Sequence, residues 1–253
     1  MGLVPAGYDG RFRFAGTVLE GPEHGPQLCS VVATSYPPQC GGPDVVGWSW
    51  DGLDAASSGG TTWGNYVVVG TWDGRRLHLT EPARVDDGGS GRPAPARKPD
   101  FSTPCAPPEG GWRPVDLDRT TTEAFERVAA LAAESPELAG LWIDQPPDGD
   151  NDPTGMVVNA RFTDRLAANE RELREVWGGA LCVSAASRTQ AELESVQRTL
   201  ADLPGFVGSG PDVIAGVVDA QVYVATERAQ RELDERFGPG VVRLAGVLQP
   251  MDG

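Results

Sequence analysis

The stretch DDGGSGRPAPARKPDFSTPCAPPEGG, residues 86–111, separates two parts of the sequence that differ in pattern. Half of its residues, 13 of 26, are Gly, Pro or Ser, and its apolar residues follow no period. Such a segment cannot bury enough apolar surface to offset the conformational entropy that ordering costs. The sequence therefore predicts two domains, at residues 1–85 and 115–253, joined by a linker at 86–114.

The part before the linker carries the short apolar runs that are typical of β-strands. Five such runs, rich in Val, Trp, Phe and Thr, are separated by clusters of Gly, Pro or Asp between residues 11 and 85. In TWDGRRLHL, Asp73 and Gly74 form a favoured turn pair between two alternating runs, which predicts a hairpin. We expect an all-β domain that folds as a small OB-like barrel, with a β-sandwich fragment as the alternative.

Helical and strand patterns alternate after the linker. TTEAFERVAALAAES and DRLAANERELREVW repeat apolar residues with helical spacing, and LWID, MVVNARF and ALCVSA have the composition of strands. Thr120 with Glu123 and Ser187 with Gln190 have capping-box spacing, which predicts that helices begin there. This alternation predicts an α/β or α+β layer of ferredoxin-like topology over residues 115–253.

The formal net charge of −15 lies mostly after the linker. Residues 115–253 carry 24 acidic and 12 basic residues, a net charge of −12. An acidic surface repels phosphate backbones, so we expect no nucleic-acid partner. A solvated surface that favours solubility explains the same charges. No run of about 18 apolar residues is present, so we expect no membrane span.

Four cysteines bear on where the protein works. Cys29 and Cys40 enclose SVVATSYPPQ, and we expect a disulfide between them, which favours an oxidising compartment. A zinc site formed by His24, Cys29, Cys40 and His78 is the alternative, although it lacks a close CxxC pair. The even number of cysteines also permits a bridge between Cys105 and Cys182.

The first residues, MGLVPAGYDGRF, lack the basic and apolar regions of a secretory signal. The sequence therefore leaves two locations open. We expect a cytoplasmic protein if the chain is complete, and an extracytoplasmic one if it is a trimmed mature form.

The stretch DGDNDPTG, residues 148–155, sets carboxylates at every second position, as a calcium loop does. The three carboxylates are those of Asp148, Asp150 and Asp152. Pro153 stands where such a loop has Gly, and Asn159 stands where it has a bidentate Glu. We therefore expect an exposed turn without a tightly held ion, with a weak Ca²⁺ site as the alternative. We expect no cofactor.

Tryptophans are the candidate ligand-binding residues. Trp48 and Trp50 in GWSW share one face of a strand, and Trp63 and Trp72 lie in the same domain. Aromatic side chains on one face of a small barrel can stack on a ligand, and they can equally form the barrel core. Motifs such as GxSxG, HExxH and GxxxxGK[ST] are absent. We therefore expect a non-catalytic binding or accessory protein whose β domain contacts a protein or small-molecule partner.

Two alternative functions stay open. The many Asp and Glu residues of the C-terminal domain could serve a carboxylate-dependent hydrolase, and the chain could be a structural scaffold. A contiguous exposed aromatic patch would favour binding. A deep pocket lined by carboxylates after residue 115 would favour the hydrolase.

Several segments resemble uncharacterised proteins of high-GC Gram-positive bacteria. These segments are GTVLEGPEHGPQLC, SYPPQCGGPDVVGWSWDG, WGNYVVVGTWDG, LREVWGGALCVS and FGPGVVRLAGVLQP, which sample both domains. The resemblance implies no activity, but many of those proteins are exported, which would imply that a signal segment is missing from this chain. The last 65 residues are also similar to the α/β pro-segments of secreted bacterial proteases, which implies a protein-binding module.

Overall fold

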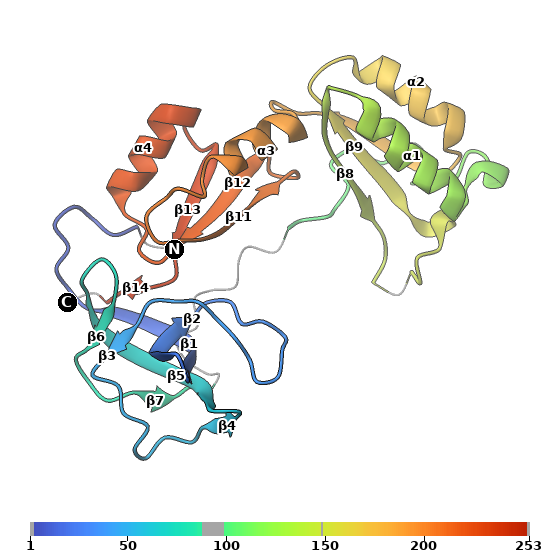
Figure 1. The fold of residues 1–253 in the computed structure, drawn as a ribbon. Helices are drawn as coiled ribbons and strands as arrows, with labels where there is room; N and C mark the ends of the chain where they lie inside the picture. The colour runs from blue at the N-terminus through green and yellow to red at the C-terminus, as the bar shows by residue number, and fades with distance from the viewer. Residues whose placement is uncertain (1–2, 88–98, 148, 252–253) are drawn as a thin grey trace. The chain divides into compact units, whose positions relative to one another are not determined.

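The computed structural model describes residues 3–87, 99–147 and 149–251, and 21% of these residues are in helices and 35% in strands (Figure 1). The chain forms two compact units. Unit 1 consists of Met1–Arg97, Ala201–Gly208 and Ala220–Gly253, and unit 2 consists of Lys98–Leu200 and Ser209–Asp219. The expected C-terminal domain, 115–253, thus contributes residues to both units, and residues 88–98 of the expected linker lie outside the described residues. None of the described helices is long and apolar enough to cross a membrane.

One sheet makes up most of unit 1, with eight strands among the described residues (Figure 1). Its main order is β14-β1-β5-β6-β3, with β2 beside β1, and with β4 and β7 beside β5. The strands are β1 (Phe12–Gly21), β2 (His24–Cys29), β3 (Val45–Val46), β4 (Ala56–Ser58), β5 (Thr61–Trp72), β6 (Leu77–Leu79), β7 (Arg84–Val85) and β14 (Gln249–Pro250). Gln27 of β2 forms an isolated bridge with Asp44 beside β3. The described strands form no closed barrel, so the expected OB-like barrel stays a prediction.

The core of unit 1 lies on one face of this sheet. β1 and β5 pair antiparallel from Phe12 opposite Gly70 to Glu20 opposite Thr62. Because side chains alternate between the two faces of a strand, every second residue of both strands points into the same core. The core residues of these strands are Phe12, Phe14, Val18, Tyr66 and Val68.

Both ends of the described chain join this unit. β14 pairs with β1, and Val247 and Leu248 belong to the same core. Near the N-terminus, the backbone N–H of Val4 donates to the carbonyl of Ala225 at 2.8 Å, and the N–H of Glu227 donates to the carbonyl of Val4 at 3.0 Å. The last residues therefore complete a sheet that begins at residue 12.

Unit 2 contains a sheet of three described strands in the order β10-β9-β8. β8 (Leu138–Asp144) is antiparallel to β9 (Val157–Phe162), and β9 is parallel to β10 (Ala180–Ala185). α1 (Thr122–Glu134) and α2 (Leu166–Val176) cover one face (Figure 1). The core between this face and the helices contains Val158, Ala160 and Phe162 of β9, together with Leu173 of α2 and Trp177, which follows α2. The sheet has one strand fewer than the four of a ferredoxin-like layer.

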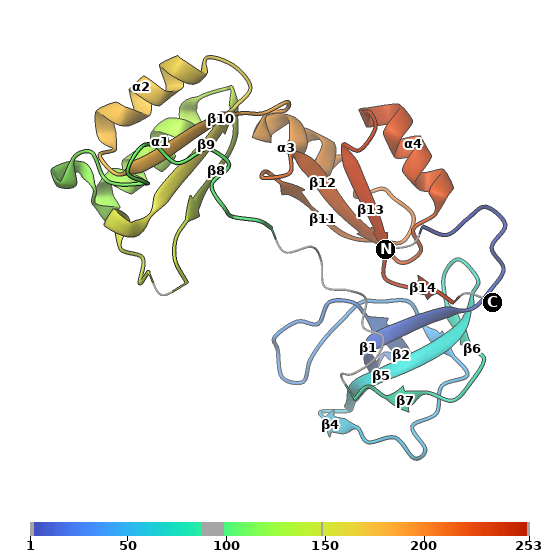
Figure 2. The ribbon, with the colours of Figure 1, turned by 180° about the vertical axis from the view of Figure 1, so that it is seen from behind.

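Residues 99–114, which we call the strap, cross the opposite face of this sheet (Figure 2). Cys105 of the strap forms a disulfide with Cys182 of β10. The backbone N–H of Thr103 also donates to the carboxylate of Asp144 at 2.7 Å. In contrast to the expected linker, the strap is part of unit 2.

The following elements repeat the order helix–strand–strand–helix–strand. They are α3 (Gln190–Arg198), β11 (Phe206–Asp212), β12 (Val217–Val222), α4 (Glu227–Phe237) and β13 (Val242–Gly246), with the sheet order β11-β12-β13. The sequences match at a spacing of 60 residues: VVNA at 157–160 corresponds to VVDA at 217–220, and Glu-Leu at 172–173 recurs at 232–233. Leu173 and Leu233 are both buried. The chain therefore contains a structural duplication.

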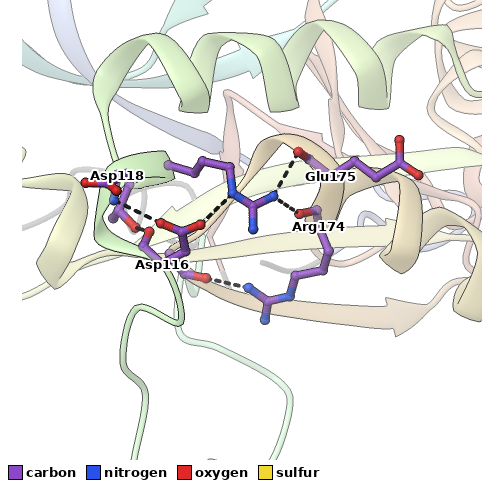
Figure 3. A network of polar contacts seen from close by, with 7 residues as sticks. Asp116, Asp118, Arg174 and Glu175 are labelled. Atoms are coloured by element: carbon purple, nitrogen blue, oxygen red, sulfur yellow. Dashed lines mark hydrogen bonds and ion pairs between the residues drawn. The ribbon is translucent and has the colours of Figure 1, made fainter.

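An arginine holds the C-terminal end of α2 (Figure 3). Arg119 Nη1 donates to the carbonyl oxygens of Arg174 and Glu175, both at 2.9 Å, and Arg119 Nε donates to the carboxylate of Asp116 at 2.7 Å. The last carbonyls of a helix have no partner within the helix, so this guanidinium supplies one. The hydrogen bond from Arg119 lowers the pKa of the Asp116 carboxyl, and burial lowers the pKa of Arg174.

We expect Gly178→Ala to destabilise unit 2. A Cβ at Gly178 would lie 2.0 Å from the carbonyl oxygen of Asp116, an atom of the backbone that cannot rotate away. The expected loss in the free energy of unfolding is about 2–4 kcal/mol. Gly155→Ala is the control, because a Cβ there meets nothing within 4 Å. Chemical denaturation would measure both variants, and equal stabilities would contradict the account.

The two disulfides are expected to stabilise the protein unequally. The loop-entropy model gives about 3 kcal/mol for Cys29–Cys40, which spans 11 residues, and about 4–5 kcal/mol for Cys105–Cys182, which spans 77. Chemical denaturation of Cys29→Ala/Cys40→Ala and Cys105→Ala/Cys182→Ala would test this order. A larger loss for the shorter loop would show that native contacts, and not loop length, set the contribution.

Candidate functional site

The four tryptophans that the sequence indicated lie in three separate clusters of unit 1. Their ring contacts are Trp48 with Trp50 and Tyr66, Trp63 with Tyr36, and Trp72 with Tyr223. Each of the four side chains is half-buried. Among the described residues no ring contact joins the three clusters, and a ligand-binding role of the four tryptophans stays a prediction.

Trp48 and Trp50 pack against the core of unit 1. Their ring centroids are 5.0 Å apart, and the indole N–H of Trp50 donates to the carboxylate of Glu20. Both rings also contact Tyr66, which is fully buried. This pair therefore serves the core, which was the alternative left open by the sequence.

Ser49, which lies between these tryptophans, lines an open cavity of about 390 Å³. Gly47, Asp51 and Glu81 also line it. Glu81 is 4.0 Å from the guanidinium of Arg11. The cavity brings two carboxylates together without a nucleophile–base pair among its described lining residues.

The confirmed disulfide Cys29–Cys40 closes a loop that presents apolar side chains to solvent. Residues 30–39, which we call the Tyr36 loop, have the sequence SVVATSYPPQ and carry no charged residue. Tyr36 is 80% exposed and Val31 is 67% exposed. The backbone N–H of Ala33 donates to the carbonyl of Gln39 at 2.9 Å and ties the two sides of the loop together.

Tyr36 rests edge-on against Trp63 of β5. Their ring centroids are 5.9 Å apart and the ring planes are at 89°. Trp63 is itself fixed in the sheet, because it lies opposite Leu19 of β1 and Ala56 of β4. The sheet thus supports an exposed aromatic side chain on a covalently closed loop. Sequence reasoning missed Tyr36, although an uncharged stretch between two cysteines in so acidic a chain is a visible signal.

The four residues of the zinc alternative have other partners in the structure. Cys29 and Cys40 are bonded to each other, His24 Nδ1 contacts the carbonyl of Gly25, and His78 Nε2 contacts the carboxylate of Asp73 at 2.8 Å. Within the described residues, no group of three or more His, Cys, Asp or Glu side chains is arranged to hold a metal ion.

The acidic loop of unit 2 is a series of turns. Asp150 and Asn151 have positive φ angles of 44° and 59°, and the carboxylate of Asp152 accepts from the N–H and the hydroxyl of Thr154 at 2.9 and 2.8 Å. These hydrogen bonds lower the pKa of Asp152. Asp148, the third carboxylate of the weak Ca²⁺ alternative, lies outside the described residues.

The hairpin between β5 and β6 is organised by Asp73. Its carboxylate accepts from the N–H groups of Arg75 and Arg76 at 2.8 and 2.7 Å and contacts His78. These contacts, with His78 first, hold the pKa of Asp73 well below its usual range. Asp73, Arg75 and Arg76 also line an open cavity of about 620 Å³, which Asp44 borders on the other side.

No protein-family model and no curated protein matches this chain.

We expect His78→Ala to raise the pKa of the Asp73 carboxyl towards its ordinary value of about 3.9. A carboxyl with a depressed pKa stabilises the fold above its unfolded-state pKa, and this stabilisation is lost as the pH falls through the folded-state pKa. In the variant, the stabilisation of the fold by the Asp73 carboxylate should therefore be lost at a higher pH than in the wild type. NMR titration of the Asp73 carboxyl carbon would measure the change, with His24→Ala as the matched control. Superimposed curves for the wild type and His78→Ala would contradict the assignment.

Proposed function

We propose that the protein is a non-catalytic binding protein that presents the Tyr36 loop to a protein partner. The observation that carries this proposal is the 80% exposure of Tyr36 on a closed, uncharged loop of a chain with net charge −15. The centres of protein interfaces are depleted in charged residues and enriched in aromatic ones. An exposed tyrosine beside Val31 has the composition of such a centre.

The closed loop also supports tight association. Binding is opposed by the entropy lost when loops and side chains become ordered at the interface. Here the disulfide and the Ala33–Gln39 bridge order the loop before any partner arrives, and Trp63 supports the tyrosine ring. The loop therefore loses part of its conformational entropy on folding, and less remains to be lost on binding.

We propose that the protein works outside the cytoplasm. Disulfides persist in oxidising compartments, and all four cysteines of the chain are paired. We also propose that the open sheet of unit 1 is related in topology to OB-like barrels, a class that binds ligands through sheet faces and loops.

The hydrolase alternative has less support. Hydrolysis by carboxylates commonly uses two of them, placed on either side of the bond that is cleaved. In unit 2 the described cavity, of about 290 Å³, has a single carboxylate, that of Asp100, among its lining residues.

Photo-cross-linking tests the proposed surface. A benzophenone amino acid in place of Tyr36 is expected to capture a protein from the envelope or secreted fraction of the producing cells. The matched control is the same probe at Val85, which is 54% exposed in the same unit but lies outside the loop.

Competition makes this test specific. Excess wild-type protein should suppress the adduct, and Val31→Ser/Tyr36→Ser should suppress it at least about tenfold less well, as expected of a hot-spot pair. Because both side chains are exposed, the double variant should keep its stability within about 0.5 kcal/mol. Equal competition by the two proteins, or the same adducts from position 85, would end the proposal.

A further inference from the structure

The strap-covered face of unit 2 contains a second candidate site, in a different unit from the Tyr36 loop. Arg161 of β9 and Ser184 of β10 lie directly opposite each other in the parallel ladder. Both line the cavity of about 290 Å³, together with Trp142 of β8 and with Asp100, Ser102 and Pro104 of the strap. The cavity is therefore built by three strands and the strap that the Cys105–Cys182 disulfide fixes to them.

The guanidinium of Arg161 is held in place but is not neutralised by the described residues. Its Nε and Nη2 donate to the carbonyl of Ala185 at 3.2 and 2.9 Å, and its Nη1 donates to the carbonyl of Ile214 at 2.5 Å. These bonds use three of the five guanidinium donors, which leaves one on each Nη among the described contacts. Two donors on adjacent nitrogens match the two oxygens of a carboxylate.

Ser184 adds an unpartnered polar group. Its Oγ is buried, and within the described residues no atom makes a hydrogen bond to it. Buried hydroxyls are nearly always paired, so an exception that lines a cavity needs an explanation. A ligand oxygen that accepts from this hydroxyl would supply one.

The carboxylate that borders the cavity does not fill this role. Oδ1 of Asp100 accepts from the backbone N–H of Ser102 at 3.1 Å, and the carboxylate has a further interaction besides this one. The positive charge of Arg161 thus faces the cavity in a chain whose net charge is −15.

The duplication provides an internal comparison. At a spacing of 60 residues, Arg161 corresponds to Gln221 of the second repeat. Gln221 is exposed and uncharged, whereas Arg161 lines the cavity that the strap borders. The arginine is therefore not a requirement of the repeated fold.

We propose that this cavity binds the carboxylate of a small organic ligand. Arg161 receives the two carboxylate oxygens, Ser184 donates to one of them, and the apolar part of the ligand packs against Trp142 and Pro104. The volume of about 290 Å³ lies at the lower end of the range for ligand pockets, which suits a small ligand such as a single amino acid. One guanidinium also matches the single charge of a carboxylate better than the two charges of a phosphate.

The test compares N-acetylalanine with its neutral isostere N-acetylalaninamide, by NMR titration of the full-length protein. The acid is expected to shift the Arg161 Nε–H signal in a saturable way, and the amide is expected to bind at least about tenfold more weakly, because a hydrogen bond to a charged group is lost. Equal binding of the two compounds, or no saturable shift with the acid, would overturn the proposal.

Substitutions distinguish binding at this site from a general effect of the protein's charge on affinity. Ser184→Ala removes a hydroxyl without a partner, so it should weaken the acid about tenfold and leave the thermal midpoint unchanged. Arg161→Gln should abolish binding, and Arg188→Gln is the control, since Arg188 lies in the same unit and bonds the carbonyl of Gly216. Unchanged affinity in Ser184→Ala, or equal losses in the two arginine variants, would contradict the assignment.

Ligands of different length distinguish two sources of the carboxylate, a peptide C-terminus and a free small acid. If trialanine binds more tightly than N-acetylalanine, and trialanine amide does not bind, the natural ligand is the C-terminus of a peptide. If the longer peptide gains nothing, the ligand is a free small acid. Both results support the carboxylate site, and both are independent of the Tyr36 loop in unit 1.

Discussion

The bond between Cys105 and Cys182 is the constraint on which unit 2 depends. α1 and α2 cover only one face of the sheet, and the other face carries apolar residues of β9 and β10, including Val157 and Ala180. A Pro- and Gly-rich strap has little apolar surface with which to hold itself there. The disulfide fixes it covalently, because it removes the freedom of a 77-residue loop from the unfolded chain. The strap then buries the sheet and forms the Arg161 cavity at the same time.

Unit 1 depends on a different long-range constraint, the return of the C-terminus to β1. Leu248 is buried in a core whose other members lie between residues 4 and 77, apart from its neighbour Val247. Such pairing has a large loop-closure cost, which must be recovered by burial once the sheet forms. The Tyr36 loop follows from this arrangement, because Trp63 can support Tyr36 only when β1 and β5 are in register.

The sequence predicted local structure better than boundaries and long-range contacts. The strands before residue 85, the helices after 115 and the Cys29–Cys40 bond are all present. Helix starts were displaced by one or two residues, to caps at Thr121 and Thr189, because several Thr and Ser residues near each start can cap a helix. The composition of residues 99–114 did not indicate that this segment packs on the sheet of unit 2, because composition reports the entropic cost of ordering but not a covalent bond that offsets it.

The duplication shows which part of the site was visible in the sequence. Two positions that face the helices are identical at a spacing of 60 residues, Val158 with Val218 and Ala160 with Ala220, because both copies must bury the same face. On the other face, Asn159 and Arg161 are replaced by Asp219 and Gln221, which are exposed. Comparing the two copies would therefore have singled out Arg161 as a residue that the fold does not demand. Its position opposite Ser184 could not have been foreseen, since it depends on the parallel register of β9 and β10 and on the disulfide that fixes the strap over them.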